Sequence, residues 1–188
     1  MIAWLVWAAI SAHGVQVDAG TLVVAEDGRW TATDKVQIRY KGAIYHADKA
    51  SYQPVSGEIT LAGNVRSTHH NVRIECEQLL VGSGQVVAEQ ARVALLRGDG
   101  ELLAELRADR VIREGVDALF DAVDFSLCTC SDRPWSVGAL TVEIVGDARR
   151  VHFSMPVLRV REVPVLALPW WSMPLKRRAT GILPPLLG

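Results

Sequence analysis

Residues 45–65 read YHADKASYQPVSGEITLAGNV, which describes a strand, a glycine-bearing turn and a returning strand. The same plan recurs in three later segments: IECEQLLVGSGQVVAEQARV at 74–93, LRADRVIREGVDALFDAVDF at 106–125 and VGALTVEIVGDARRVHF at 137–153. The four units begin 29 to 32 residues apart. Internal similarity at such a period predicts a stack of similar hairpins rather than a globule with varied parts.

The apolar alternation changes phase in the middle of each unit's first strand. Tyr45 and Ala47 share one face of a strand, whereas Ala50 and Tyr52 share the other. A strand with a period of two residues cannot do this without an extra residue or a bend. The same switch follows the small residues at 76, 108 and 139. We therefore predict a β-bulge or corner just after positions 47, 76, 108 and 139.

Turn signals punctuate the chain at short intervals, and no stretch keeps a helical period of 3.6 residues. The signals are Asp27-Gly28, Lys41-Gly42, Ser56-Gly57, Gly63-Asn64, Gly82-Ser83-Gly84, Gly98-Asp99-Gly100, Glu114-Gly115 and Gly146-Asp147. The chain is therefore predicted to be all-β. Because stacked corners curl a sheet over on itself, we expect a jelly roll or folded β-sandwich of repeated hairpins with an apolar groove.

Charge and composition exclude two broad classes of protein. The chain carries 20 Lys and Arg against 21 Asp and Glu, so it lacks the basic surface that nucleic-acid binding demands. With 49% hydrophobic and 22% charged residues it is not disordered. We expect a folded domain with no nucleic-acid partner.

The residues expected to face inward are mostly small and aliphatic, and two explanations fit them. They suit a thin, tightly interdigitated sandwich, or they leave room for hydrocarbon, with each buried methylene contributing about 0.8 kcal/mol. The second explanation predicts a groove that accepts acyl chains. Its lining residues would be Tyr45, Ile59, Leu61, Ile74, Val86, Leu106, Val137 and Phe153.

The first residues have the character of a targeting segment. Residues 2–10 read IAWLVWAAI, too short to span a bilayer but typical of the apolar part of a signal peptide, and small residues follow. No Lys or Arg precedes them, and a buried first strand or helix is the alternative. We expect 1–14 to be a signal segment, with export and a mature chain beginning at Val15.

Residues 157–188, VLRVREVPVLALPWWSMPLKRRATGILPPLLG, resemble a junction segment of the LptD/OstA family of LPS-assembly proteins. In that family the segment joins a periplasmic domain to an outer-membrane barrel. The matching positions are Val163-Pro164-Val165, Leu168-Pro169-Trp170, Ser172, Pro174-Leu175, Arg178, Thr180-Gly181, Leu183-Pro184 and Gly188. The repeats agree, because Ala47-Asp48 and Ala62-Gly63-Asn64-Val65 are similar to the OstA unit, as is Ala108-Asp109.

The resemblance implies a fold, a function and partners. Residues 15–165 would form the family's periplasmic jelly roll, and 166–188 a junction to an outer-membrane barrel that this chain lacks. The domain would bind the lipid A acyl chains of lipopolysaccharide at the periplasmic face of the outer membrane. It would receive them from a periplasmic bridge protein through the edge strand at about Val15 to Val24, and pass them to the barrel. The alternative is a free-standing OstA/LptA-like bridge component, which has no use for the junction segment.

The three cysteines receive different expectations. Cys76 lies in phase with apolar neighbours and is expected to be a buried core thiol. A bridge between Cys128 and Cys130 would be strained, because they are two residues apart on a strand. The family ties its periplasmic domain to the barrel by disulfides, so the resemblance implies that Cys128, or else Cys130, pairs with a barrel cysteine.

No catalytic or metal-binding motif is present in the sequence. The five histidines lack the spacing of a metal set, and no nucleophile elbow, P-loop or dinucleotide fingerprint occurs. We expect no metal, no cofactor and no enzymatic activity; a sugar-binding or hydrolytic jelly roll would need a polar cleft or a carboxylate pair. Aromatic and basic residues adjoin near the C-terminus, as at a membrane interface, and make up a predicted membrane junction: Trp170, Trp171, Lys176, Arg177 and Arg178.

Overall fold

The computed structural model describes residues 3–12, 15–40, 42–69, 72–82, 84–96, 100–126, 134–146 and 150–174, with backbone only for 3–12, 69 and 103. These residues form one 14-stranded sheet. Its strands are β1 (Ala3–Ala12), β2 (Val15–Val24), β3 (Trp30–Tyr40), β4 (Ala43–Gln53), β5 (Glu58–His69), β6 (Val72–Val81), β7 (Gln85–Leu96), β8 (Leu102–Glu114), β9 (Asp117–Ser126), β10 (Trp135–Val145), β11 (Arg150–Ser154), β12 (Val157–Val160), β13 (Val163–Ala167) and β14 (Trp170–Pro174). None of the described segments is a helix able to cross a membrane.

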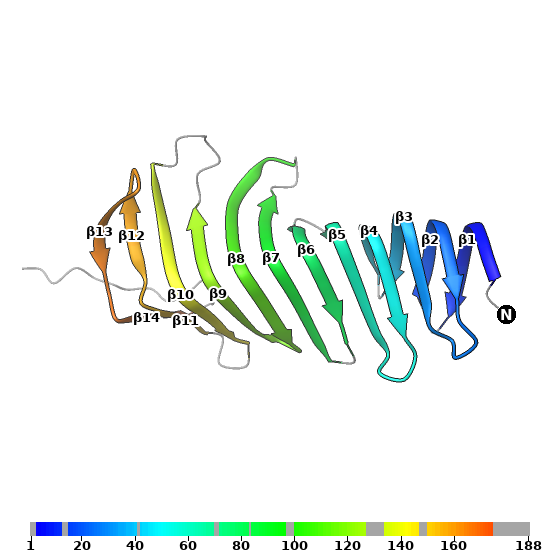
Figure 1. The fold of residues 1–188 in the computed structure, drawn as a ribbon. Coiled ribbons are helices and arrows are strands. Elements are labelled where there is room, and N and C mark those ends of the chain that lie inside the picture. Colours follow the sequence, from blue (N-terminus) through cyan, green and yellow to red (C-terminus); the bar gives the residue numbers. More distant parts are fainter. Residues whose placement is uncertain are drawn as a thin grey trace, which may run out of the picture.

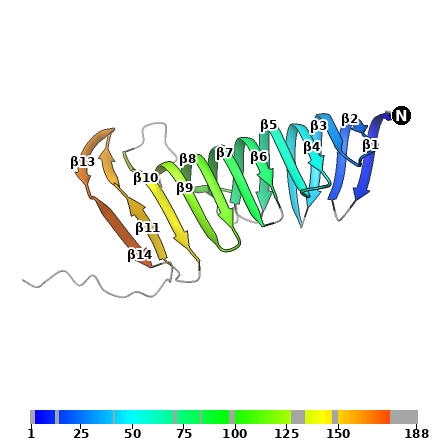
Figure 2. The same cartoon turned by 60° about the horizontal axis from the view of Figure 1, so that its bottom comes forward.

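Each strand from β1 to β10 pairs antiparallel with the next one in the chain, and β11 pairs with β14. Figures 1 and 2 show the strands stacked side by side, from β1 at one end to β13 and β14 at the other. Neighbouring antiparallel strands need only short turns, which the glycine-bearing turn signals supply. The predicted all-β stack of repeated hairpins is confirmed.

The predicted corners are confirmed at the predicted positions. The ladder between β4 and β5 breaks between His46 and Lys49, directly after the small residue Ala47. Corresponding gaps in pairing fall at Cys76–Glu77 in β6, Ala108–Asp109 in β8 and Leu140 in β10. Both halves of each strand therefore turn their apolar residues to the same side, so that Tyr45, Ala47, Ala50 and Tyr52 are all more buried than the residues between them.

The odd-numbered strands make the same corner with a left-handed backbone residue. Positive φ values occur at Asp34 and Lys35 in β3, Asn64 in β5, Gln90 in β7 and Ala122 in β9. In β3 and β5 the corner also shifts the register, as expected of a bulge. Gly63-Asn64, counted among the turn signals, is therefore not a turn. It lies inside β5, where the left-handed backbone bends the strand instead of forming a turn between two strands.

The C-terminal strands continue the repeat with proline at the corner. One half of β10 pairs with β12 and the other half with β11, and Met155-Pro156 joins these two short strands. Leu168-Pro169 joins β13 to β14 in the same way, and the two corners exchange hydrogen bonds from the Met155 and Leu168 amides to the Pro169 and Pro156 carbonyls, each 3.0 Å long. Proline has no N–H to give to a ladder, which suits a break in pairing. The predicted boundary at 165/166 falls within β13.

The predicted signal segment forms part of the sheet in this structure. Strand β1 pairs with β2 from Ala3 opposite Val24 to Ala12 opposite Val15. The place of β1 decides which strand ends the sheet, because β2 becomes the edge strand once β1 is gone.

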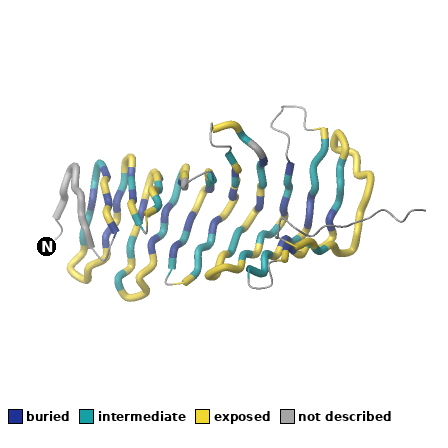
Figure 3. Tube along the Cα trace, turned by 180° about the vertical axis from the view of Figure 1, so that it is seen from behind, coloured by how far each residue is buried: buried dark blue, intermediate teal, exposed yellow. Residues whose placement is uncertain are grey.

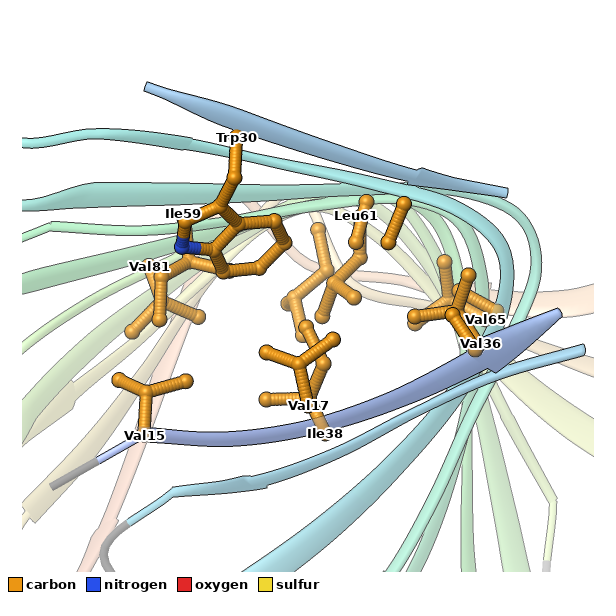
Figure 4. Packing of buried hydrophobic residues seen from close by; sticks show 14 of the residues in the cluster. Val15, Val17, Trp30, Val36, Ile38, Ile59, Leu61, Val65 and Val81 are labelled. Atoms are coloured by element: carbon orange, nitrogen blue, oxygen red, sulfur yellow. The ribbon is translucent and has the colours of Figure 1, made fainter. Parts of the chain in front are cut away.

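The core lies between two walls made by the two halves of the bent strands. Figure 3 shows buried segments along the strands and exposed turns at both rims. In Figure 4, Trp30 and Ile59 from one wall and Val15 and Val17 from the other point into the same space. Trp30 stacks on Tyr52 with 5.8 Å between ring centroids and is only 5% exposed. This stack covers the rim of the interior at β3 and β4.

Candidate functional site

The strand register arranges the predicted groove residues into rows. Residues directly opposite each other in antiparallel strands lie on the same face of the sheet. On one wall this rule gives the Tyr45 row: Val17, Ile38, Tyr45, Ser67, Ile74, Val93, Leu106, Phe125, Val137, Leu158 and Leu166. Four of the eight predicted groove residues, Tyr45, Ile74, Leu106 and Val137, therefore share one line.

The opposite wall contributes two further rows. The Leu61 row runs near the corner: Leu22, Ala32, Ala50, Leu61, Leu79, Ala88, Val111, Phe120, Val142, Phe153 and Trp171. The rim row runs near the turns: Val24, Trp30, Tyr52, Ile59, Val81, Val86, Arg113, Ala118, Ile144, Val151 and Met173. The remaining predicted groove residues, Ile59, Leu61, Val86 and Phe153, lie in these two rows.

The predicted groove residues differ in how far they are buried. Ile59 and Leu61 are 3% and 1% exposed and belong to a core cluster that extends from β2 to β7. Half-buried Tyr45 and Val86 pack against that cluster. Leu106 and Phe153 are also half-buried but pack against a second cluster, formed by β8 to β11. Ile74 and Val137 are half-buried.

The second cluster differs from the first in having no fully buried residue larger than valine. Its fully buried members are alanine and valine: Ala108, Val123, Ala139, Val142 and Val151. Its large side chains keep part of their surface exposed: Leu106, Phe120, Phe125, Ile144 and Phe153. Aliphatic and aromatic surface that remains accessible inside a fold is suited to an apolar ligand. The arrangement can therefore hold hydrocarbon between β8 and β11 more readily than between β2 and β7.

Sequence reasoning missed two aromatic members of this cluster. Phe120 and Phe125 lie on either side of the β9 corner, and both face the interior. The signal was present, because the returning strand shows the same change of phase between Phe120 and Val123 as the first strands do. The prediction used that change only in the first strand of each unit.

Cys76 is a free, buried thiol, as predicted. It is 7% exposed, and burial raises its pKa from 9.0 to about 11. The thiolate is the reactive form of cysteine, so this environment makes Cys76 a packing residue rather than a nucleophile. Cys128 and Cys130 lie outside the described residues.

The predicted membrane junction is only partly described. Trp170 and Trp171 belong to β14, and Trp171 stacks on Phe153 with 5.2 Å between ring centroids. Trp170 is 72% exposed. Lys176, Arg177 and Arg178 lie outside the described residues. Among the side chains that the structure describes, no three His, Cys, Asp or Glu gather as metal ligands do.

The sequence was compared with family models and with known proteins. No family model matches the chain. The LPS-assembly protein LptD of Bordetella pertussis is 24% identical over 163 residues, which is 86% of this chain and 20% of that protein. LptD of Thiobacillus denitrificans is 28% identical over 84% of this chain and 22% of that protein. LptD of Pseudoalteromonas atlantica is 23% identical over 93% of this chain and 23% of that protein.

The chain thus spans about a fifth of the length of the relatives it matches. Over most of its own length, the chain resembles a domain-sized part of the LPS-assembly protein LptD.

Proposed function

We propose that this domain binds lipopolysaccharide in the periplasm, receives it from a bridge protein and passes it to an outer-membrane translocon barrel. The observation that supports the proposal is the set of apolar rows that runs from β2 to β14 between the two walls. Acyl chains need contact with apolar surface and no directional partners. Rows of aliphatic and aromatic side chains provide that contact at every strand, so an acyl chain can bind at any position along them.

The unequal packing of the interior favours a lipid path over a fully interdigitated sandwich. A sandwich core buries its large side chains to the extent seen for Ile38 and Leu61, which are 1% exposed. Leu106, Phe120 and Phe153 are instead half-buried. Covering such surface with hydrocarbon is favourable by about 25 cal/mol per Å². Lipid would therefore complete a core that the chain leaves partly open.

The two ends of the sheet suit the two proposed exchanges. At the β2 end, removal of residues 1–14 leaves an unpaired strand that a bridge protein could extend by β-augmentation. At the other end, Leu166, Trp171 and Met173 are 51%, 43% and 36% exposed and end the inner rows. A barrel domain attached there would cover this apolar end.

The relatives named above are all LptD proteins, which favours a barrel-associated role over a free-standing bridge component. In this proposal the domain is exported, acts at the periplasmic face of the outer membrane, uses no cofactor and performs no chemical step. The exposed Trp170 would then lie near the membrane interface, where tryptophan is favoured.

Site-specific photo-crosslinking of the purified chain to lipopolysaccharide tests the proposal. A crosslinker at Leu106 or Phe153 faces the interior, whereas one at Arg107 lies next to Leu106 on the outer face. Arg73 beside Ile74 provides a second outer-face control. We expect lipopolysaccharide adducts at the inner positions and background labelling at the two arginines. Equal labelling of both sets would contradict binding in the interior.

A further inference from the structure

The rim row contains one charged residue among its otherwise apolar members. Arg113 lies directly opposite Val86 of β7 and Ala118 of β9. Val86 packs against the first core cluster, and Ala118 lies opposite Ile144, which packs against the second. Because opposed residues share a face, Arg113 is on the interior side of the sheet. It stands where the two clusters meet.

The guanidinium of Arg113 remains at the mouth of the interior. The side chain is exposed, and its Nε donates a 3.1 Å hydrogen bond to the carbonyl oxygen of Gly115 in the β8–β9 turn. This bond uses one of the five guanidinium N–H donors. The other donors remain available to a ligand at the rim.

The nearby carboxylates have other partners. Glu114 accepts a 2.7 Å hydrogen bond from the Gln85 side chain, and Asp117 accepts a 2.8 Å bond from the Gly146 amide. Within the described part of the chain, no carboxylate forms an ion pair with Arg113. A cation that faces an apolar interior without a protein counter-charge is complementary to an anionic amphiphile.

We propose that Arg113 binds the phosphate of lipid A while an acyl chain lies on Val111, Phe120 and Phe153. This inference rests on the proposed function and adds the position and polarity of the bound lipid. A guanidinium pairs with phosphate through two parallel hydrogen bonds, which fixes orientation as well as charge. The head group stays in water at the rim, and only the chain enters the second cluster.

The dimensions of the sheet agree with this arrangement. Val111, Phe120, Val142 and Phe153 follow one another across β8, β9, β10 and β11. Adjacent strands lie about 4.8 Å apart, so this part of the row is roughly 14 Å long beside Arg113. Val111, Phe120 and Phe153 keep part of their surface exposed along it, and the smaller Val142 is buried between them. The first cluster offers no comparable path, because Leu61 and its neighbours in the Leu61 row are already buried.

The test compares two forms of lipid A on three purified proteins: the wild-type chain, Arg113→Ala and Arg110→Ala. Arg110 is the matched control, because it is exposed on the outer face of the same strand opposite Glu89 and Asp121. We expect Arg113→Ala to weaken binding of diphosphorylated lipid A by about tenfold, as for a charge-assisted phosphate contact. Binding of fully dephosphorylated lipid A should be unchanged, and Arg110→Ala should alter neither.

The remaining outcomes separate this inference from the proposed function. If the wild-type chain binds both forms and Arg113→Ala loses nothing, the head-group site is wrong and the lipid path stands. Equal loss for both forms would mean that Arg113 only covers the neighbouring apolar surface, which also overturns the site. If the wild-type chain binds neither form, the proposed function fails, and the inference fails with it. Thermal unfolding of each variant checks that the fold is retained.

Discussion

The Asn64 side-chain amide donates a 2.8 Å hydrogen bond to Oδ2 of Asp48, which joins the corner of β5 to the corner of β4. A Cβ added to Gly63 would lie 2.6 Å from the same oxygen. Glycine thus gives the aspartate room, and Asn64, with φ of 47°, supplies the left-handed residue that bends the strand. The corner between β2 and β3 repeats the packing, because Gly20 has the same 2.6 Å relation to Asp34.

Gly63→Ala should therefore destabilise the domain through two separable effects. Gly57 also has a positive φ, 67° against 77° for Gly63, but nothing lies within 4 Å of the Cβ it would acquire. Gly57→Ala should cost about 1 kcal/mol of unfolding free energy through backbone conformation alone, and Gly63→Ala roughly 1 kcal/mol more through the clash. Urea denaturation measures both values. Equal costs would show that Asp48 moves aside freely.

The stability of the domain should depend on pH through Cys76. Burial raises the pKa of its thiol from 9.0 to about 11, so between these values the unfolded chain ionises first. This contribution to stability is fully present below about pH 9 and is lost as the pH rises towards 11. Denaturation midpoints should fall more steeply over this range with Cys76 present than in Cys76→Ala. Both proteins should carry serine at 128 and 130, so that only one thiol titrates.

A second measurement on the same protein reports the accessibility of Cys76. Alkylation followed by mass spectrometry should show slow modification in the folded chain and fast modification in denaturant. Fast reaction in the folded chain would contradict its burial. Such a result would also place the residue on the outer face and remove the corner in β6.

Much of this fold could be predicted because the apolar alternation changes phase at each corner. The change of phase after Ala47, Cys76 and Ala108 has no explanation other than a bend, since an inward residue on each side must reach the same core. The same logic placed Tyr45 and Leu106 on the interior, where the register puts both in one row.

The parts that could not be predicted have weak local signals. Gln90, Ala122 and Met155 have a left-handed backbone although these residue types do not favour positive φ, so the sequence has no local signal for it. Arg113 was missed because charge normally indicates an outward position, although its spacing of two residues from Val111 places it inward. The cross-strand register shows that Arg113 lies on the inner face of the sheet, as its spacing from Val111 indicates and its charge does not.

The edge at β2 provides a third prediction, about the bridge protein. In the described structure β1 covers the outer edge of β2. A chain that begins at Val15 should therefore bind a periplasmic bridge protein more tightly than the chain of residues 1–188, because its edge needs no strand displacement. Surface plasmon resonance with an immobilised bridge protein measures the difference. Removal of 175–188 from the other end provides a control that should leave the affinity unchanged.

That experiment has a clear opposing outcome. Equal affinities with and without residues 1–14 would place the contact away from β2.

The stack between Phe153 and Trp171 fixes the last strand of the sheet to the second core cluster. Phe153 packs against that cluster, and Trp171 lies directly opposite it on β14. Trp171 is 43% exposed, whereas the adjacent Trp170 is 72% exposed. The two residues are of the same type and lie on opposite faces of β14, so each substitution is a control for the other.

Trp171→Ala should lower the unfolding free energy by about 1 to 2 kcal/mol, through lost aromatic contact and a partial cavity beside Phe153. Trp170→Ala should change it by less than about 0.5 kcal/mol, as is usual for an exposed position. In Trp171→Ala the amides of β14 should also exchange hydrogen faster than those of β10, because β14 has lost its anchor to the core. Equal destabilisation by the two substitutions would contradict the anchoring role, and a larger effect at Trp170 would reverse the assignment of faces on β14.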